Sequence, residues 1–312
     1  MIRYFITEGE LKARVKALKP GWLDKAREMT EKFRSEGKYP KNTDNIWTDI
    51  KDVFLDLQYN KCAYCERRLG GKSYNRSEYD VEHYRPKNAV KAWPNEAVKL
   101  AESERGSNIR NYDFALGEAT DTGYYLLALN VRNYAVACKG CNSVLKSNYF
   151  PVAKNRVLDS DDYDLLKTEE PYLLCPVGDV DDDNPEDIIT FIGYVPVTKE
   201  SSGARYRRGR VTIDFFDLAL WEELILERAS IIVTIWLARS ILLNPAASSV
   251  EKAMAQLKID EHTSPQSPHT NCAKAFVRLC RENPARADKC VEEATPQVEK
   301  LLKRQEKSDA AS

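Results

Sequence analysis

The chain has 312 residues, of which 43% are hydrophobic and 30% are charged, and its formal net charge is −1. This composition is typical of a soluble globular protein of one or two domains and excludes an intrinsically disordered chain. The near-neutral charge also excludes any argument from overall basicity to nucleic-acid binding.

Membrane contact is not expected. The longest uncharged apolar stretch covers only residues 229–238, which is too short to cross a bilayer. The N-terminus does not resemble a signal peptide. We therefore expect a cytoplasmic protein.

The first 58 residues are expected to form an N-terminal helical segment. Thr7 and Glu10 have the spacing of a capping box, and apolar residues continue at helical spacing until Gly37. A third helix is predicted over residues 44–57, with Trp47 in the core, because apolar residues recur on one face of it. This helix leads to the first pair of cysteines.

Two Cys-x-x-Cys pairs predict a structural zinc site. They are Cys62 with Cys65 and Cys138 with Cys141, and 72 residues separate them. Cytosolic cysteines at this spacing are more often zinc ligands than disulfide halves, and two such turns complete a tetrahedral site. An ordinary zinc ribbon closes after about 15–20 residues, so a substantial segment lies inside this one.

That segment contains a carboxylate directly followed by an imidazole, Glu82 and His83, in a short predicted strand over residues 79–84. Hydrolysis of a phosphodiester requires a base to deprotonate water and a cation to hold the leaving oxygen. His83 can be that base, and Glu82 can hold the cation with Asp80 in reserve. The alternative is a Glu-His pair on the surface of a strand.

The residues around the second cysteine pair add to this pattern. Asn133 lies five residues before that pair, and Asn142 directly follows it. With Glu82, His83 and the four cysteines, they resemble the HNH endonuclease superfamily, whose core is a ββα-metal unit that often carries two zinc knuckles. The resemblance implies that His83 is the general base, that Glu82 and Asn142 ligate the catalytic metal, and that Asn133 braces the loop that orients His83.

Many superfamily members have Asp at the position of Glu82 and His at the position of Asn142. A carboxamide oxygen is a hard, neutral ligand, which suits Mg²⁺ or Mn²⁺ better than a tightly held zinc ion. We therefore expect Zn²⁺ at the cysteines and Mg²⁺ or Mn²⁺ at the catalytic residues.

The sequence resembles the PtuB-type HNH nucleases of Septu and retron-associated antiphage defence more closely than the superfamily at large. The matching segments include residues 61–66, 81–87, 133–142 and 170–176, and the similarity extends over about residues 40–230. It implies a nuclease that cleaves DNA during infection beside an ATPase partner protein of the same system. The chain has no phosphate-binding loop of its own, so the ATPase must be another protein. Homo- or hetero-oligomeric assembly is left open.

Basic residues gather near Glu82 and His83 although the chain as a whole is not basic. Residues 61–91 contain eight Lys or Arg and four Asp or Glu, and local patches of this kind are what phosphate contacts require. The alternative is an ordinary solvated surface. The predicted nucleic-acid contacts are Arg67, Arg68, Lys72, Arg76, Arg85, Lys87 and Lys146.

The sequence predicts an α+β fold, mostly α, in three parts. Residues 1–58 form the N-terminal helices, residues 59–155 form the HNH ββα-metal core with its four-cysteine zinc site, and residues 156–312 form a C-terminal α/β to helical region with a candidate partner-binding surface. Within the core, residues 88–128 are expected to be a mostly exposed insertion with one short helix, and residues 143–148 to be the helix of the ββα unit. Short strands and turns are expected over residues 151–210, then helices with a break at residues 264–268.

The predicted function is metal-dependent hydrolysis of DNA. Two alternatives remain from the sequence. One is a non-catalytic zinc-containing module that binds nucleic acid or protein, and the other is an HNH nuclease that acts on RNA, since the motif does not itself select deoxyribose.

Overall fold

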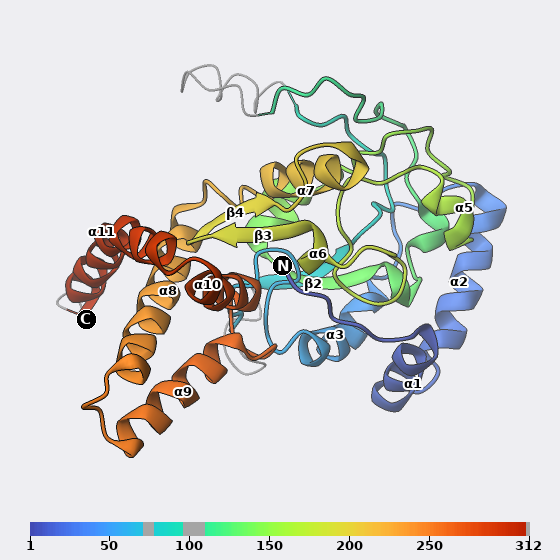
Figure 1. Cartoon of the computed structure of the whole chain (residues 1–312). Helices are drawn as coiled ribbons and strands as arrows, with labels where there is room; N and C mark the ends of the chain where they lie inside the picture. The colour runs from blue at the N-terminus through green and yellow to red at the C-terminus, as the bar shows by residue number, and fades with distance from the viewer. Residues whose placement is uncertain (71–77, 96–109, 310–312) are drawn as a thin grey trace.

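The computed structural model describes residues 1–70, 78–95 and 110–309 (Figure 1). Helices dominate this part of the chain, and two small antiparallel sheets of two strands each complete it. The mostly helical α+β composition predicted from the sequence is confirmed.

The N-terminal helices form as predicted. Helix α1 (Glu8–Leu18) begins with the capping box, in which the backbone NH of Glu10 donates to Thr7 Oγ1 at 3.3 Å and the NH of Thr7 donates to Glu10 Oε2 at 3.0 Å. Helix α2 (Trp22–Glu36) ends at Gly37, whose φ of 65° lies in the left-handed region that glycine adopts at no steric cost. The predicted third helix is divided into a 3-10 segment, η1 (Ile46–Ile50), and α3 (Lys51–Leu57).

The first sheet pairs β1 (Tyr79–His83) with β2 (Tyr134–Cys138) in antiparallel register, which places Glu82 opposite Ala135. Strand β2 continues almost directly into η4 (Gly140–Lys146), a π-helical segment. The predicted helix over residues 143–148 therefore begins earlier than expected, and Asn142 lies inside it rather than at its start.

Buried Gln58 connects α3 to this sheet. Its Nε2 donates to the carbonyl oxygens of Lys61 and Val136, and its Oε1 accepts from the NH of Val136 at 2.8 Å. These bonds satisfy buried backbone groups of both segments. They hold the start of the first cysteine pair against the strand that leads to the second pair.

The described part of residues 88–128 is less exposed than predicted. Residues 124–129 are buried, and they include the 3-10 segment η2 (Tyr125–Leu127), which contacts α2. The expectation of a mostly exposed insertion was wrong for this stretch, because its apolar side chains pack beneath α2. A second 3-10 segment, η3 (Val131–Asn133), leads into β2.

Residues 151–210 contain more helix than predicted. Two short helices, α5 (Tyr163–Lys167) and α6 (Pro185–Ile188), precede the hairpin of β3 (Ile189–Ile192) and β4 (Val195–Thr198), and α7 (Gly203–Phe215) follows it. Only the hairpin and the turns agree with the expectation for this region.

The C-terminal third is helical, as predicted. It consists of α8 (Glu222–Leu243), α9 (Ser249–Thr263), α10 (Thr270–Glu282) and α11 (Pro284–Asp309), and the predicted break falls between α9 and α10. Helices α8 and α9 pack against each other and form a hairpin that extends away from the rest of the molecule (Figure 1). None of the described helices combines the length and the apolarity that a membrane span requires.

Segments that are distant in the sequence meet in one hydrophobic core. Tyr4 pairs with Val177 in an isolated parallel bridge, and the ammonium of Lys61 donates to the carbonyl oxygens of Pro265 and Ser267. The turn that carries the first cysteine pair is thus held by the C-terminal part of the chain. The three-part division predicted from the sequence remains a prediction.

Candidate active site

The four cysteines meet in one buried cluster. Their Sγ atoms all lie within 4.8 Å of one another, and those of Cys65 and Cys138 are 3.9 Å apart. A tetrahedron with Zn–S bonds of about 2.3 Å has edges of about 3.8 Å, whereas a disulfide would need about 2.05 Å. The prediction that the four cysteines come together is confirmed, and their four-thiol donor set fits a structural Zn²⁺.

Glu82 is buried in β1, which pairs with β2, the strand that ends at Cys138. Its Oε1 lies 3.3 Å from Lys146 Nζ. Burial raises the pKa of the Glu82 carboxyl to about 7, although Lys146 and Lys87 act in the opposite direction. Near neutral pH the carboxylate is therefore poised between its two protonation states, and a bound cation would favour the ionised form.

His83 is held in one orientation by its neighbours. Its ring packs edge-on against Trp47 and Tyr134, with centroids 4.8 and 5.0 Å away, and its Nε2 lies 3.0 Å from the carbonyl oxygen of Ala128. Because a carbonyl only accepts, Nε2 carries the proton and Nδ1 is the basic nitrogen of the neutral ring. Burial, and secondly the charge of Lys87, lowers the pKa of His83 well below its usual value, so the ring is neutral at pH 7.

Asn133 connects the two segments that surround His83. Its Oδ1 accepts from the NH of Arg85 at 2.8 Å, and its Nδ2 donates to the carbonyl oxygens of Arg85 and Leu127. The first contact fixes the chain just after His83, and the second fixes the residue before Ala128. Asn133 thus ties these two segments together, and its predicted bracing role remains a prediction.

A cavity of about 480 Å³ brings most of the predicted catalytic residues together. Glu82, His83 and Asn142 all line it, as does the reserve ligand Asp80, which also pairs with Lys139 and Lys51. Successive side chains of a strand point to opposite faces, yet Glu82 and His83, at the end of β1, both line the cavity. The remaining lining residues are Asn45, Trp47, Thr48, Val81, Pro86, Lys87, Ser143, Ser147 and Asn148.

Trp47 is a site residue that the sequence did not identify. We expected a core position, and its side chain is buried, but it also lines the cavity and contacts His83. The ammonium of Lys87 lies 4.5 Å from the centroid of the Trp47 ring, within the range of a cation–π contact. An aromatic residue shortly before the first cysteine pair was the available signal, but nothing in the sequence tied it to His83.

Of the seven predicted nucleic-acid contacts, Lys87 is the one that lines this cavity among the residues the structure describes. Arg67 pairs with Glu227 at 3.4 Å, and Arg68 donates to the carbonyl oxygen of Gln266 at 3.3 Å, so both face the C-terminal part instead. Lys72 and Arg76 lie outside the described residues.

Arg85 and Lys146 are buried, which corrects their predicted role at the DNA surface. Arg85 forms an ion pair with Glu169 and donates to the carbonyl oxygen of Leu166 at 2.9 Å. Lys146 faces Glu82. The guanidinium of Arg85 and the ammonium of Lys146 are buried and each faces a carboxylate of the protein itself.

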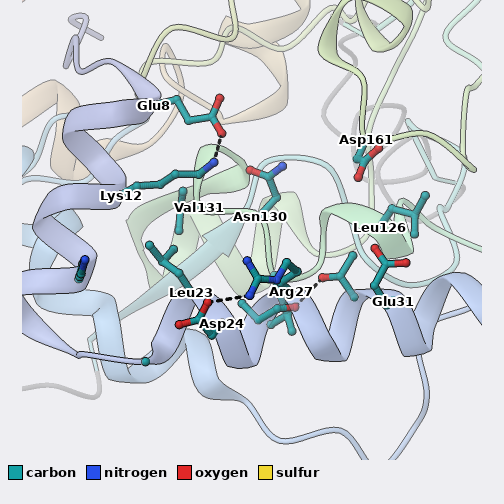
Figure 2. Close-up of a pocket in the computed structure, with 15 residues that line it drawn as sticks. Glu8, Lys12, Leu23, Asp24, Arg27, Glu31, Leu126, Asn130, Val131 and Asp161 are labelled. Atoms are coloured by element: carbon teal, nitrogen blue, oxygen red, sulfur yellow. Dashed lines mark hydrogen bonds and ion pairs between the residues drawn. The ribbon is translucent and has the colours of Figure 1, made fainter.

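A larger cavity, of about 510 Å³, lies between α1, α2 and residues 126–131 (Figure 2). Four of its charged side chains form two ion pairs: Lys12 lies 2.6 Å from Glu8, and Arg27 lies 2.8 Å from Asp24 (Figure 2). Of the residues predicted for the active site, none that the structure describes lines this larger cavity. The cavity at Glu82 and His83 is therefore the better candidate despite its smaller size.

Comparison with known proteins agrees with the resemblance noted in the sequence. Over 103 residues the chain is 30% identical to the Septu protein PtuB of Bacillus mycoides (strain KBAB4). This stretch covers 33% of the chain and 26% of the relative, so the chain spans about a quarter of the length of that curated protein. No family model and no solved structure matches. The resemblance to PtuB is thus confirmed over one third of the chain.

Proposed function

We propose that this chain is a metal-dependent endonuclease of the HNH type, which hydrolyses phosphodiester bonds of DNA in antiphage defence. The observation that carries the proposal is that His83, Glu82 and Asn142 line one cavity, beside strand β2, which ends at Cys138 of the four-cysteine cluster. The similarity to a Septu PtuB protein supports the biological setting.

Each residue has a role that follows from its surroundings. The neutral ring of His83 accepts a proton from water at Nδ1, because Nε2 is held by Ala128. Oxygen atoms of Glu82 and Asn142 are hard ligands that would hold Mg²⁺ or Mn²⁺. When bound, that ion would polarise the phosphoryl group and neutralise charge on the leaving oxygen. Lys87, which lines the cavity, would contact a phosphate of the DNA.

The cysteine cluster has a structural role in this proposal. The NH of Ala63, between the cysteines of the first pair, donates to the carbonyl oxygen of Val136 in β2 at 3.0 Å. A zinc ion at the four thiolates would fasten this turn to the end of β2, and structural zinc sites contribute about 10–16 kcal/mol of apparent binding free energy. It would thereby fix both strands of the candidate core.

The proposal is tested by cleavage of supercoiled plasmid with Mg²⁺ or Mn²⁺, beside a transfer RNA substrate, with zinc quantified in each preparation. We expect His83→Ala to lose nicking at unchanged zinc content. His262→Ala is the matched control, because His262 lies in α9 and does not line the cavity. Cleavage of the RNA alone would favour the RNA nuclease, and no cleavage by the wild type, with or without an ATPase partner, would favour a binding module.

We also propose an ATPase as partner protein in the cytoplasm, bound through the α8–α9 hairpin. Large apolar side chains are exposed along this hairpin, and its tip contains the apolar run from Ile241 to Leu243. Exposed apolar surface of this kind, when contiguous, marks sites of protein interaction. The exposed residues are Leu237, Ile241, Leu243, Val250, Met254 and Leu257.

A further inference from the structure

Lys146 carries a charge that the fold keeps entirely away from solvent. It is the last residue of η4, its side chain is 0% exposed, and its Nζ lies 3.3 Å from Glu82 Oε1. Burial of an ammonium costs several kcal/mol unless an opposite charge compensates it. A contact to the DNA backbone, as predicted from the sequence, does not explain this position.

Lys146 pairs with Glu82 without lining the cavity itself. Glu82 lines the cavity, whereas Lys146 does not, and Lys146 Nζ lies 3.3 Å from Glu82 Oε1. Apart from this ion pair, Nζ has no hydrogen bond of good geometry to any described group. The contact with Glu82 is therefore what compensates the buried charge, with the ring of Phe150 at 5.7 Å as a weaker neighbour.

The helical segment η4 serves the site at two positions. Asn142 lines the cavity, and Lys146 follows four residues later, which is close to one turn of a π-helix. The same element thus carries Asn142, which lines the cavity, and Lys146, which pairs with Glu82. A shift of η4 would move both groups that surround the Glu82 carboxylate.

We propose that Lys146 is a positioning residue, which fixes the Glu82 carboxylate toward the cavity and so sets the affinity of the site for a divalent cation. This inference rests on the proposed function, in which Glu82 is a metal ligand. Groups that bind a ligating carboxylate restrict its orientation before the metal binds. Their loss typically weakens metal binding about 10–100-fold. Lys87, which lines the cavity, is then the lysine that meets phosphate.

The test is the affinity of the zinc-loaded full chain for Mn²⁺ without DNA, measured by electron paramagnetic resonance. The variants are Lys146→Met, Lys146→Gln, Lys146→Arg and Glu82→Gln, each checked for zinc content and melting temperature. Lys154→Met is the matched control, since Lys154 is exposed and pairs with Glu170 away from the cavity. We expect Lys146→Met, Lys146→Gln and Glu82→Gln to weaken Mn²⁺ binding at least about 10-fold, Lys146→Arg to restore most of it, and Lys154→Met to leave it unchanged.

The outcomes separate the two hypotheses. If Glu82→Gln weakens Mn²⁺ binding but folded Lys146→Gln binds as the wild type does, the positioning role is overturned and the proposed metal site stands. If Glu82→Gln also binds as the wild type does, both fail. In DNA cleavage, Lys146→Gln should lower kcat and leave KM unchanged. A raised KM at unchanged Mn²⁺ affinity would instead make Lys146 a phosphate contact.

Discussion

At the scale of single residues, burial shifts the pKa values of Glu82 and His83 in opposite directions, and both shifts favour the neutral form. It raises the pKa of the carboxyl and lowers that of the imidazole, because in each case it disfavours the charged form. In the proposed function, these adjacent residues of β1 then have different roles, His83 as the base and Glu82 as a metal ligand. His83 stays available as a base at neutral pH, while Glu82 gains from any cation that reaches the cavity.

Trp47 is one of the residues that hold the ring of His83 in place. Trp47→Ala removes the edge contact with His83 and the ring beneath Lys87, and it leaves a space in the core. We expect the free energy of unfolding to fall by about 3–5 kcal/mol, as for other buried tryptophans, and plasmid nicking to fall with it. Urea denaturation and the plasmid assay measure both effects.

Trp47→Phe is the control for this change, since it keeps an aromatic ring against His83 and under Lys87. It should retain more than half of the stability that Trp47→Ala loses and most of the activity. Equal losses in the two variants would show that the indole itself, rather than aromatic packing on His83, is required.

At the scale of elements, local signals predicted what local chemistry decides. The capping box at Thr7 and the terminating Gly37 marked the start of α1 and the end of α2, and the spacing of the cysteines indicated their cluster. The strand at residues 79–84 also followed from a short motif. In each case a few neighbouring residues carry the constraint.

The elements that the sequence missed depend on contacts with distant parts of the chain. Residues 124–129 are buried by distant segments, which include α2 and Phe150. Arg85 is buried in an ion pair with Glu169, 84 positions later. Helix α7 has mixed polar and apolar residues without a clear periodic face, so its pattern did not distinguish it from a loop. Pairing partners and burial of this kind are not visible in a single sequence.

The α8–α9 hairpin leads to a prediction about assembly. Met254→Glu places a charge on the exposed apolar side of α9, so we expect binding to the ATPase to weaken at least about 10-fold, since a charge buried without a partner is costly at an interface. The melting temperature should stay unchanged, because Met254 is 62% exposed. Co-purification of the two proteins after co-expression measures the effect.

Gln256→Glu is the matched control on the same helix. Gln256 is exposed and lies away from the apolar side defined by Val250, Met254 and Leu257. It should leave co-purification unchanged. If Met254→Glu co-purifies as well as Gln256→Glu does, the hairpin is not the binding surface for the ATPase.

At the scale of the whole molecule, the C-terminal part reaches the zinc-binding turn through buried polar groups. The NH of His269 donates to the carbonyl oxygen of Glu66, directly after Cys65, and the His269 ring lies 2.7 Å from Glu227. Arg67 from the same turn also pairs with Glu227. The start of α10, the first half of α8 and the first cysteine pair therefore depend on one another for stability.

This junction predicts how stability depends on pH. Burial lowers the pKa of His269, and the charge of Arg228 lowers it further. Glu227 and Glu66 raise this pKa, but the effect of burial is larger. The unfolded chain then binds a proton near about pH 6.5 while the folded chain does not. The contribution of a neutral His269 is therefore complete above about pH 6.5 and is lost as the pH falls below it, by up to about 1.4 kcal/mol per pH unit.

The measurement is urea denaturation of the zinc-loaded wild type and of His269→Gln at about pH 7.5, 6.5 and 5.5. These pH values bracket the pKa of a histidine in the unfolded chain. Glutamine keeps a donor for Glu227 but does not titrate, so the variant should lose less stability than the wild type does over the lower half of this range. His262→Gln is the comparison variant on α9: burial also lowers the pKa of His262, so this variant shows how much of the pH dependence arises outside the junction at Glu66 and Glu227. An identical pH dependence in the wild type and His269→Gln would mean that His269 already carries its proton in the fold, and that the ion pair with Glu227 outweighs burial.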